Sequence, residues 1–308
     1  MTARIGLILA FAALISGSGC ATGTGGNSGS SGGGSAIPGV QGTVLEEGIT
    51  PRDNNFTQIA QEFLDEAANT EDEAAQEVAY EQALNAAQQG IAADSMNPKS
   101  YFQGAVAAVN VGQYQTAADY CDTAEELHPR YILQTEPWRE RGWVDAYNAA
   151  LEPLNAGDLE TAVEIFEGAD ALYSQRPEAL LQLGSAYTRL GQHEDAAESF
   201  RKALGILDEA EEVAMADTAE AETWEQHYEI ASLGLGQALQ YSEQYEAAAE
   251  HFGQLLADDP ENAQILGSLA SVLTELEMPD SVDALYENLL NRPGLTEFDY
   301  ANAGVGLY

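Results

Sequence analysis

The chain has 308 residues, of which 51 are acidic and 11 basic, so its formal net charge is −40 at pH 7. Binding to nucleic-acid phosphates requires clustered Lys and Arg side chains, so this composition excludes nucleic acid as a partner. It also disfavours docking on anionic lipid through charge. Because 45% of the residues are apolar, the chain is long enough and apolar enough to bury a sizeable core.

Residues 1–19 are predicted to be a lipoprotein signal peptide. Arg4 supplies a positive start, and Ile5 to Ile15 form an apolar run that is too short to span a bilayer. Small residues then precede Cys20, which resembles a bacterial lipobox, although Gly17 stands where Leu is commonest. In that family the cysteine is diacylated and becomes the mature N-terminus. The alternative is an ordinary secretory peptide that happens to contain a cysteine.

The segment 20–53 is predicted to be a lipidated cysteine followed by a flexible linker. Residues 21–36 are mostly Gly and Ser, which cannot form a packed core, and residues 37–53 form an irregular lead-in. Such a tether holds a folded domain away from a membrane through the N-terminal lipid. Ala21 is not Asp, which by resemblance to Gram-negative sorting favours the outer membrane. We therefore expect a lipid-anchored protein of the cell envelope, facing the periplasm or the surface.

The first helices are predicted after this linker. Asn54 or Asn55 is suited to cap a helix that runs to about Asn69. A second helix is expected from Glu71 to Ala92, with its buried side formed by Ala75, Val78, Ala79, Ala83, Leu84 and Ala87. Asn97-Pro98 predicts the next helix start, because Asn caps helices and Pro fits the first helical position.

Residues 177–208 contain the strongest pattern in the sequence. Apolar residues spaced by three and four predict two amphipathic helices joined by a turn at Gly191-Gln192-His193. Gly184 is small enough to let the partner helix approach, and Tyr187 and Phe200 are expected to fill the seam between the two helices.

This helix–turn–helix pattern recurs in phase and resembles the tetratricopeptide repeat (TPR), a unit of about 34 residues. The resemblance implies an all-α fold: a TPR-type α-solenoid of stacked antiparallel helix pairs over 54–308, preceded by the signal peptide and a disordered Gly/Ser tether. Units are expected near 54–97, 98–131, 143–176, 177–210, 229–262 and 263–296, with a half unit at 297–308.

Two insertions interrupt the repeats. The first, Ile132 to Gly142, contains Trp138, Arg139 and Arg141 and is the densest basic spot in the chain. The second, about Glu211 to Tyr228, is expected to be helical and to lengthen the helix that follows, with Trp224 and Tyr228 on one face.

Few residues are arranged for chemistry. None of the histidines at 128, 193, 227 and 251 is paired with another at metal-ligand spacing. Cys121 takes the position that Phe200 and Phe252 hold in their units, so we expect a buried core thiol. Because most carboxylates fall on polar helix faces, we expect a non-enzymatic protein with no cofactor and no bound metal.

Stacked helix pairs present a concave groove lined mainly by the first helix of each pair. The predicted lining is rich in amides and aromatics: Phe102, Asn110, Tyr147, Asn148, Asn155, Gln182, Arg189, Gln237 and Tyr241. Such side chains suit a peptide segment of a protein partner. We therefore expect a lipid-anchored scaffold in an envelope or secretion assembly. The alternative is a glycan- or nutrient-binding outer-membrane lipoprotein in which Trp138, Tyr147, Trp224 and Tyr241 stack on sugar rings.

Overall fold

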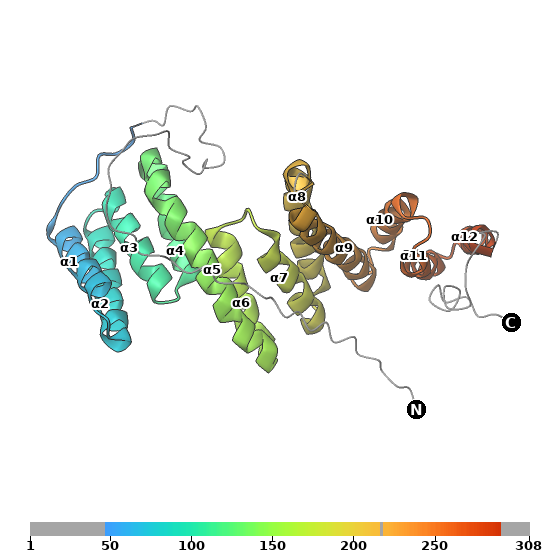
Figure 1. Ribbon diagram of the computed structural model, residues 1–308, viewed down its shortest axis with the longest axis horizontal. Helices are drawn as coiled ribbons and strands as arrows, with labels where there is room; N and C mark the ends of the chain where they lie inside the picture. Colours follow the sequence, from blue (N-terminus) through green and yellow to red (C-terminus); the bar gives the residue numbers. More distant parts are fainter. Residues whose placement is uncertain (1–46, 216–217, 291–308) are drawn as a thin grey trace. The chain divides into compact units, whose positions relative to one another are not determined.

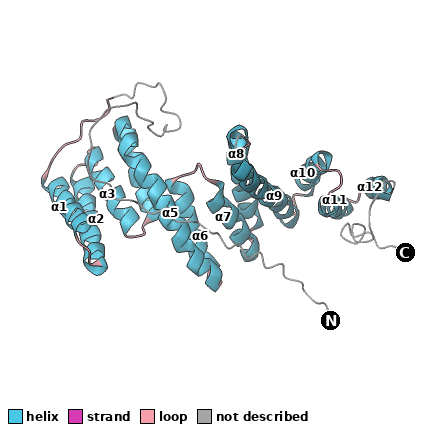
Figure 2. Ribbon diagram, in the orientation of Figure 1, coloured by secondary structure: helices cyan, strands magenta, loops and turns pink. Residues whose placement is uncertain are grey.

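The computed structural model describes residues 47–215 and 218–290, and every regular element in these ranges is a helix (Figures 1 and 2). The α-helices are α1 (Asn55–Asn69), α2 (Glu73–Ala93), α3 (Pro98–Asn110), α4 (Tyr114–Leu127), α5 (Ile132–Ala156), α6 (Leu159–Leu172), α7 (Pro177–Leu190), α8 (His193–Ala214), α9 (Thr218–Tyr241), α10 (Tyr245–Asp258), α11 (Ala263–Glu275) and α12 (Pro279–Leu290), with a short 3-10 helix, η1 (Pro129–Tyr131), before α5. None of these helices is both long and apolar enough to cross a bilayer. The predicted signal peptide, Cys20, most of the linker and the half unit 297–308 lie outside the described residues.

Successive helices form antiparallel pairs, and the pairs stack on one another (Figure 1). Within the stack, first helices contact first helices, as α3 contacts α5 and α7 contacts α9. Second helices make the corresponding contact between α4 and α6, and α2 and α6 each contact the first helix of the next pair. Each pair therefore buries its apolar faces against its neighbours, which confirms the predicted all-α solenoid for the described residues.

The helix starts follow from local chemistry. The Asn54 side chain accepts hydrogen bonds from the backbone N–H groups of Phe56 and Thr57 at 2.9 and 3.0 Å. The Thr57 hydroxyl in turn accepts from the Asn54 N–H at 2.9 Å, which completes a reciprocal cap. Asn97 caps α3 by accepting from the Lys99 N–H at 3.3 Å, with Pro98 at the first helical position. The predicted starts at Asn54 and Asn97-Pro98 are thus confirmed.

Aromatic rings of second helices lie directly on glycines of first helices. A Cβ added at Gly184 of α7 would lie 2.6 Å from the ring of Phe200 in α8, and so would one added at Gly234 of α9. Gly236 of α9 stands in the same relation to Phe252 of α10, at 2.4 Å. The helices can approach this closely only because glycine has no side chain. The predicted roles of Gly184 and Phe200 are confirmed.

Cys121 is fully buried in α4, as predicted. In its unit the neighbouring Tyr120 places a ring against Gly104 of α3, where an added Cβ would meet it at 2.8 Å. Burial raises the pKa of the Cys121 thiol to about 12. The reactive thiolate is therefore essentially absent at neutral pH.

The predicted buried side of α2 is wrong at two positions. Ala75 and Val78 are exposed, Val78 by 49% of its surface. The buried stripe of α2 follows Ala79, Ala83, Ala86 and Gly90. Val78 is one residue, about 100° of helix rotation, off that stripe, and Ala75 lies in the first turn before the stripe begins.

The predicted insertion 132–142 does not separate two units. It forms the first half of α5, a helix of 25 residues in total. The second insertion does lengthen the next helix, as predicted: α9 begins at Thr218, and Trp224 stacks on Tyr228 with ring centroids 4.8 Å apart.

Arg139, which belongs to the predicted basic spot, is only 9% exposed. Its guanidinium donates to Glu125 at 3.0 Å and to Asp122, both on α4, and to the Leu172 carbonyl of α6 at 3.2 Å. Burial lowers the pKa of Arg139, but the hydrogen bonds with Glu125 and Asp122 outweigh this effect and raise it. The charged side chain thus connects α4, α5 and α6.

Residues 47–53, the end of the predicted linker, are held on the solenoid. The Ile49 N–H donates to the Leu127 carbonyl at 2.7 Å. The Asn97 side chain accepts from the Arg52 N–H at 3.1 Å and donates to the Arg52 carbonyl at 2.9 Å. Lys99 pairs with Asp53. We call this segment the strap.

The Phe200 contact predicts opposite effects for two glycine substitutions. Gly184→Ala should destabilise the protein by about 1–3 kcal/mol, because the Phe200 ring lies against Gly234 as well as Gly184 and cannot retreat. Gly205→Ala in α8 is the matched control, since nothing lies within 4 Å of the added Cβ. It should stabilise the helix by about 0.5–1 kcal/mol. Urea unfolding followed by circular dichroism measures both, and equal effects would contradict this packing.

The Arg139 contacts predict that two arginine substitutions in α5 differ in their effect on stability. Arg139→Met should cost about 3 kcal/mol, because it leaves the largely buried Glu125 carboxylate without its cationic partner. Arg141→Met is the control, since the Arg141 side chain is 55% exposed and its ion pair with Asp145 is screened by water. Thermal unfolding of the two variants should separate them clearly, and similar melting temperatures would refute the structural role of Arg139.

Candidate binding surface on the first helices

The predicted groove residues lie on four first helices, and we call this set the first-helix surface. Asn148, Asn155, Arg189 and Tyr241 are exposed, Tyr241 by 59% of its surface. The half-buried members are Phe102, Asn110, Gln182 and Gln237. Tyr147 is buried.

Contacts between neighbouring helices bring some of these residues together. Tyr147 of α5 hydrogen bonds with Gln182 of α7, while burial raises the pKa of the Tyr147 hydroxyl and this hydrogen bond opposes the rise. Asn110 of α3 accepts from Arg141 of α5 at 3.4 Å. These contacts join the surface across α3, α5 and α7.

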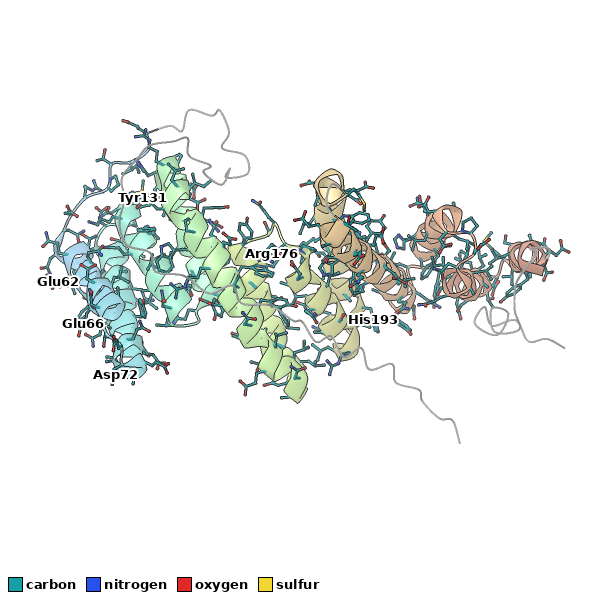
Figure 3. The ribbon with its side chains drawn as sticks, in the orientation of Figure 1. Glu62, Glu66, Asp72, Tyr131, Arg176 and His193 are labelled. Atoms are coloured by element: carbon teal, nitrogen blue, oxygen red, sulfur yellow. The ribbon has the colours of Figure 1, made fainter. Side chains whose placement is uncertain are left out.

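Other members turn toward local partners. Phe102 packs on Tyr131 of η1, with ring centroids 5.3 Å apart. The ring centroids of Tyr241 and His193 are 5.1 Å apart. His193, at the beginning of α8, is labelled in Figure 3. Gln240, next to Tyr241, donates to the Ser271 hydroxyl of α11 at 2.9 Å. The α9 end of the surface is therefore connected to α8 and α11.

The aromatic side chains considered for sugar stacking differ in accessibility. Tyr147 stacks on Trp143, with centroids 5.1 Å apart, and is 9% exposed, so little of its ring is available. The Arg141 guanidinium lies 5.3 Å from the Trp138 ring centroid. Trp224 is half-buried, and Tyr241 is exposed.

A cluster of charge and aromatic groups lies at the beginning of α7. The Arg176 guanidinium (Figure 3) is 4.1 Å from the centroid of the Trp143 ring, a cation–π arrangement. Arg176 also donates to Glu178 at 3.2 Å. Glu178 lies one turn before Gln182 on α7 and therefore extends the first-helix surface.

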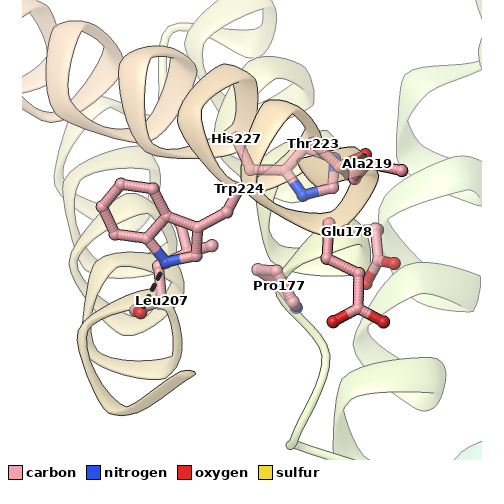
Figure 4. Close-up of a pocket in the computed structure, with 8 residues that line it drawn as sticks. Pro177, Glu178, Leu207, Ala219, Thr223, Trp224 and His227 are labelled. Atoms are coloured by element: carbon pink, nitrogen blue, oxygen red, sulfur yellow. Dashed lines mark hydrogen bonds between the residues drawn. The ribbon is translucent and has the colours of Figure 1, made fainter. Parts of the chain in front are cut away.

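The hollow beside Glu178 was not predicted from the sequence. A pocket of about 380 Å³ opens where the beginning of α7 meets α8 and α9 (Figure 4). Its lining includes Pro177, Glu178, Leu207, Thr223, Trp224 and His227. The sequence feature that pointed toward this pocket was Trp224. It was expected on one face of a lengthened helix, but the sequence did not indicate which residues it would contact.

Among the described residues, no group of three or more His, Cys, Asp or Glu side chains is placed to hold a metal ion. Burial lowers the pKa of His227 and of His251, and the His251 ring contacts the Ser232 carbonyl at 2.8 Å. What the surface provides is hydrogen-bonding amides, accessible aromatic rings and a few charges.

Comparison with protein-family models finds two matches, both described as tetratricopeptide repeat, over residues 177–206 and 233–287. Residues 177–206 and 233–287 of this chain carry tetratricopeptide repeats. The matched TPR segments correspond to α7 with most of α8 and to the end of α9 with α10, α11 and most of α12. No curated protein matches the sequence.

Solved structures similar to this chain include two that are described as tetratricopeptide repeat proteins, and MamA. YrrB, described as a TPR protein with an unusual peptide-binding site, is 16% identical, with a TM-score of 0.39, over 71% of this chain and 97% of YrrB. A tetratricopeptide repeat protein from Parabacteroides merdae is 19% identical, with a TM-score of 0.33, over 80% of this chain and 85% of the other. MamA is 13% identical, with a TM-score of 0.36, over 61% and 93%.

Proposed function

We propose that this chain is a non-enzymatic TPR scaffold that binds a polypeptide segment of a partner protein on the first-helix surface. The observation that carries the proposal is the exposure of amide side chains on successive first helices, with Asn148 and Asn155 exposed and Gln182 and Gln237 half-buried. Amides both donate and accept hydrogen bonds, so they match the backbone of an extended or helical peptide. Because each pair repeats the arrangement, one segment can contact several helices.

The proposed setting is the cell envelope. Support comes from the sequence: an apolar run of signal-peptide length, Cys20 after small residues, and a Gly/Ser tether. In this proposal the diacylated Cys20 anchors the chain, with the outer membrane favoured, and the TPR units hold the partner within an envelope or secretion assembly.

Site-specific photo-crosslinking tests partner binding. A benzophenone amino acid placed at Asn148 or Tyr241 should capture a discrete protein partner in intact envelopes, because both side chains are exposed on the first-helix surface. Glu164 of α6 and Glu246 of α10 are the matched controls, since they are exposed on second helices. Capture that is equal at all four positions, or absent from all of them in a folded protein, would contradict the proposal. Binding of oligosaccharides without any protein capture would support the glycan alternative.

Substitution of the two cysteines tests the anchor. Cys20→Ala should move the protein from the membrane fraction to the soluble fraction and remove the lipid mass, because Cys20 is the proposed acylation site. Cys121→Ala should leave it in the membrane fraction, since Cys121 is buried in α4. Cell fractionation and intact-mass spectrometry measure both. A Cys20→Ala variant that is released no more than Cys121→Ala would rule out this anchor.

A further inference from the structure

The pocket at the beginning of α7 is built from three helices of two TPR units. Pro177 and Glu178 come from α7, Leu207 from α8, and Thr223, Trp224 and His227 from α9. In Figure 4 the His227 ring lies on the side of Pro177 and Glu178, whereas the Trp224 indole is turned toward Leu207. The hollow exists because the early part of α9, the second insertion in sequence, extends the helix beyond the ordinary unit.

The pocket adjoins the first-helix surface. Glu178 is four residues before Gln182 on α7, and His227 is fourteen residues before Tyr241 on α9. Since side chains four and fourteen residues apart share a helix face, both pocket residues are in line with members of the surface. A segment bound on the first-helix surface can therefore place one side chain in the pocket.

The aromatic wall of the pocket is held in a fixed orientation. The Trp224 Nε1–H donates to the Leu207 carbonyl at 2.7 Å, and the indole stacks on Tyr228. A fixed indole ring presents electron density to a cation more effectively than a mobile one, because no rotamer freedom is lost on binding.

The carboxylate of Glu178 has an unused acceptor. Arg176 donates to Oε1 at 3.2 Å, but Oε2 is buried and no hydrogen-bond donor of the described chain reaches it. A buried acceptor without a donor is unfavourable, so a ligand that supplies an N–H group there gains that hydrogen bond. The Arg176 guanidinium cannot easily turn to serve it, because it also lies over the Trp143 ring.

The imidazole of His227 does not repel a cation in the pocket. Burial lowers the pKa of His227, and the charge of Glu178 only partly opposes this effect, so the imidazole is neutral at pH 7. The lining thus combines an aromatic ring, the carboxylates of Glu178 and Glu220, and a neutral imidazole in a chain of net charge −40. An anionic ligand would meet repulsion, and an apolar one would leave the Glu178 oxygen without a donor.

We propose that this pocket receives the ammonium or guanidinium group of a lysine or arginine side chain on the bound polypeptide. The cationic group donates to Glu178 Oε2 and lies near the Trp224 ring, and the strongly acidic chain attracts basic segments toward it. The inference rests on the proposed function and specifies the chemistry of its partner: a segment that presents a basic side chain at this position.

The test uses short peptides with capped ends as probes, so that only their side chains are charged. They are acetyl-Gly-Lys-Gly-Lys-Gly-amide and the two peptides in which arginine or glutamate replaces both lysines. Heteronuclear NMR of the purified protein reports the indole N–H signals, and Trp224→Phe assigns the one that belongs to the pocket. The lysine and arginine peptides should shift the Trp224 signal in a saturable way, and the glutamate peptide should not. Shifts of equal size from all three peptides, or a Trp224 signal that stays unmoved, would overturn the proposal.

Two matched variants separate the pocket from general attraction to an acidic protein. Glu178→Gln and Glu164→Gln each remove one negative charge, but only Glu178 lines the pocket. Glu178→Gln should weaken binding about tenfold, the typical effect of losing a hydrogen bond to a charged group. Glu164→Gln should weaken it less than about twofold, as for a screened surface charge. Equal weakening would mean that the peptides bind only through the overall charge.

A third variant tests the pocket even if Glu178→Gln fails to fold. Thr223 is exposed at the pocket, so Thr223→Lys should fold and place a tethered ammonium where the ligand side chain would lie. This variant should block the lysine peptide, and undiminished binding would contradict the assignment. Capture at Asn148 or Tyr241 by photo-crosslinking does not depend on the pocket. If that capture succeeds while the peptide tests fail, only the pocket inference is wrong.

Discussion

The solenoid depends on aromatic rings that lie against glycines. Phe200 occupies the space left by the missing side chains of Gly184 and Gly234, and Phe252 does the same at Gly236. Each of these contacts sets the distance between two helices, and Phe200 sets it for two helix pairs at once. Because α7 and α9 are held to the same ring, the spacing of the first-helix surface and the position of the pocket both follow from this packing.

Polar contacts complement the ring contacts where α4, α5 and α6 meet. Arg139 connects three helices through Glu125, Asp122 and the Leu172 carbonyl. A buried guanidinium is costly unless its donors are satisfied, so its partners fix the position of α5 relative to α4 and α6 more specifically than apolar packing alone would. These three helices therefore gain a defined register from a single charged side chain.

The sequence was sufficient to predict features that depend on local chemistry or on strict spacing. The caps at Asn54 and Asn97, the seam filled by Phe200 and the burial of Cys121 are of this kind. Val78 was assigned to the wrong face because α2 is rich in alanine, so its weak apolar pattern did not define one stripe. The contacts of Arg139 were not predicted, because its partners are 14 and 17 residues away in the sequence. The placement of Tyr147 and Gln182 side by side, and the pocket at Glu178, depend on how units pack, which no spacing within one unit records.

The strap determines how a mechanical force would enter the protein. A pull on the chain ahead of residue 47 is resisted first by the Ile49 contact with the Leu127 carbonyl and by the paired hydrogen bonds between Arg52 and Asn97. These bonds connect to the end of α4 and the start of α3, so tension reaches the second helix pair before it reaches the first turn of α1. A tethered solenoid would therefore be held from its second pair, and unravelling of α1 from its N-terminal end would begin only after the strap had been peeled away.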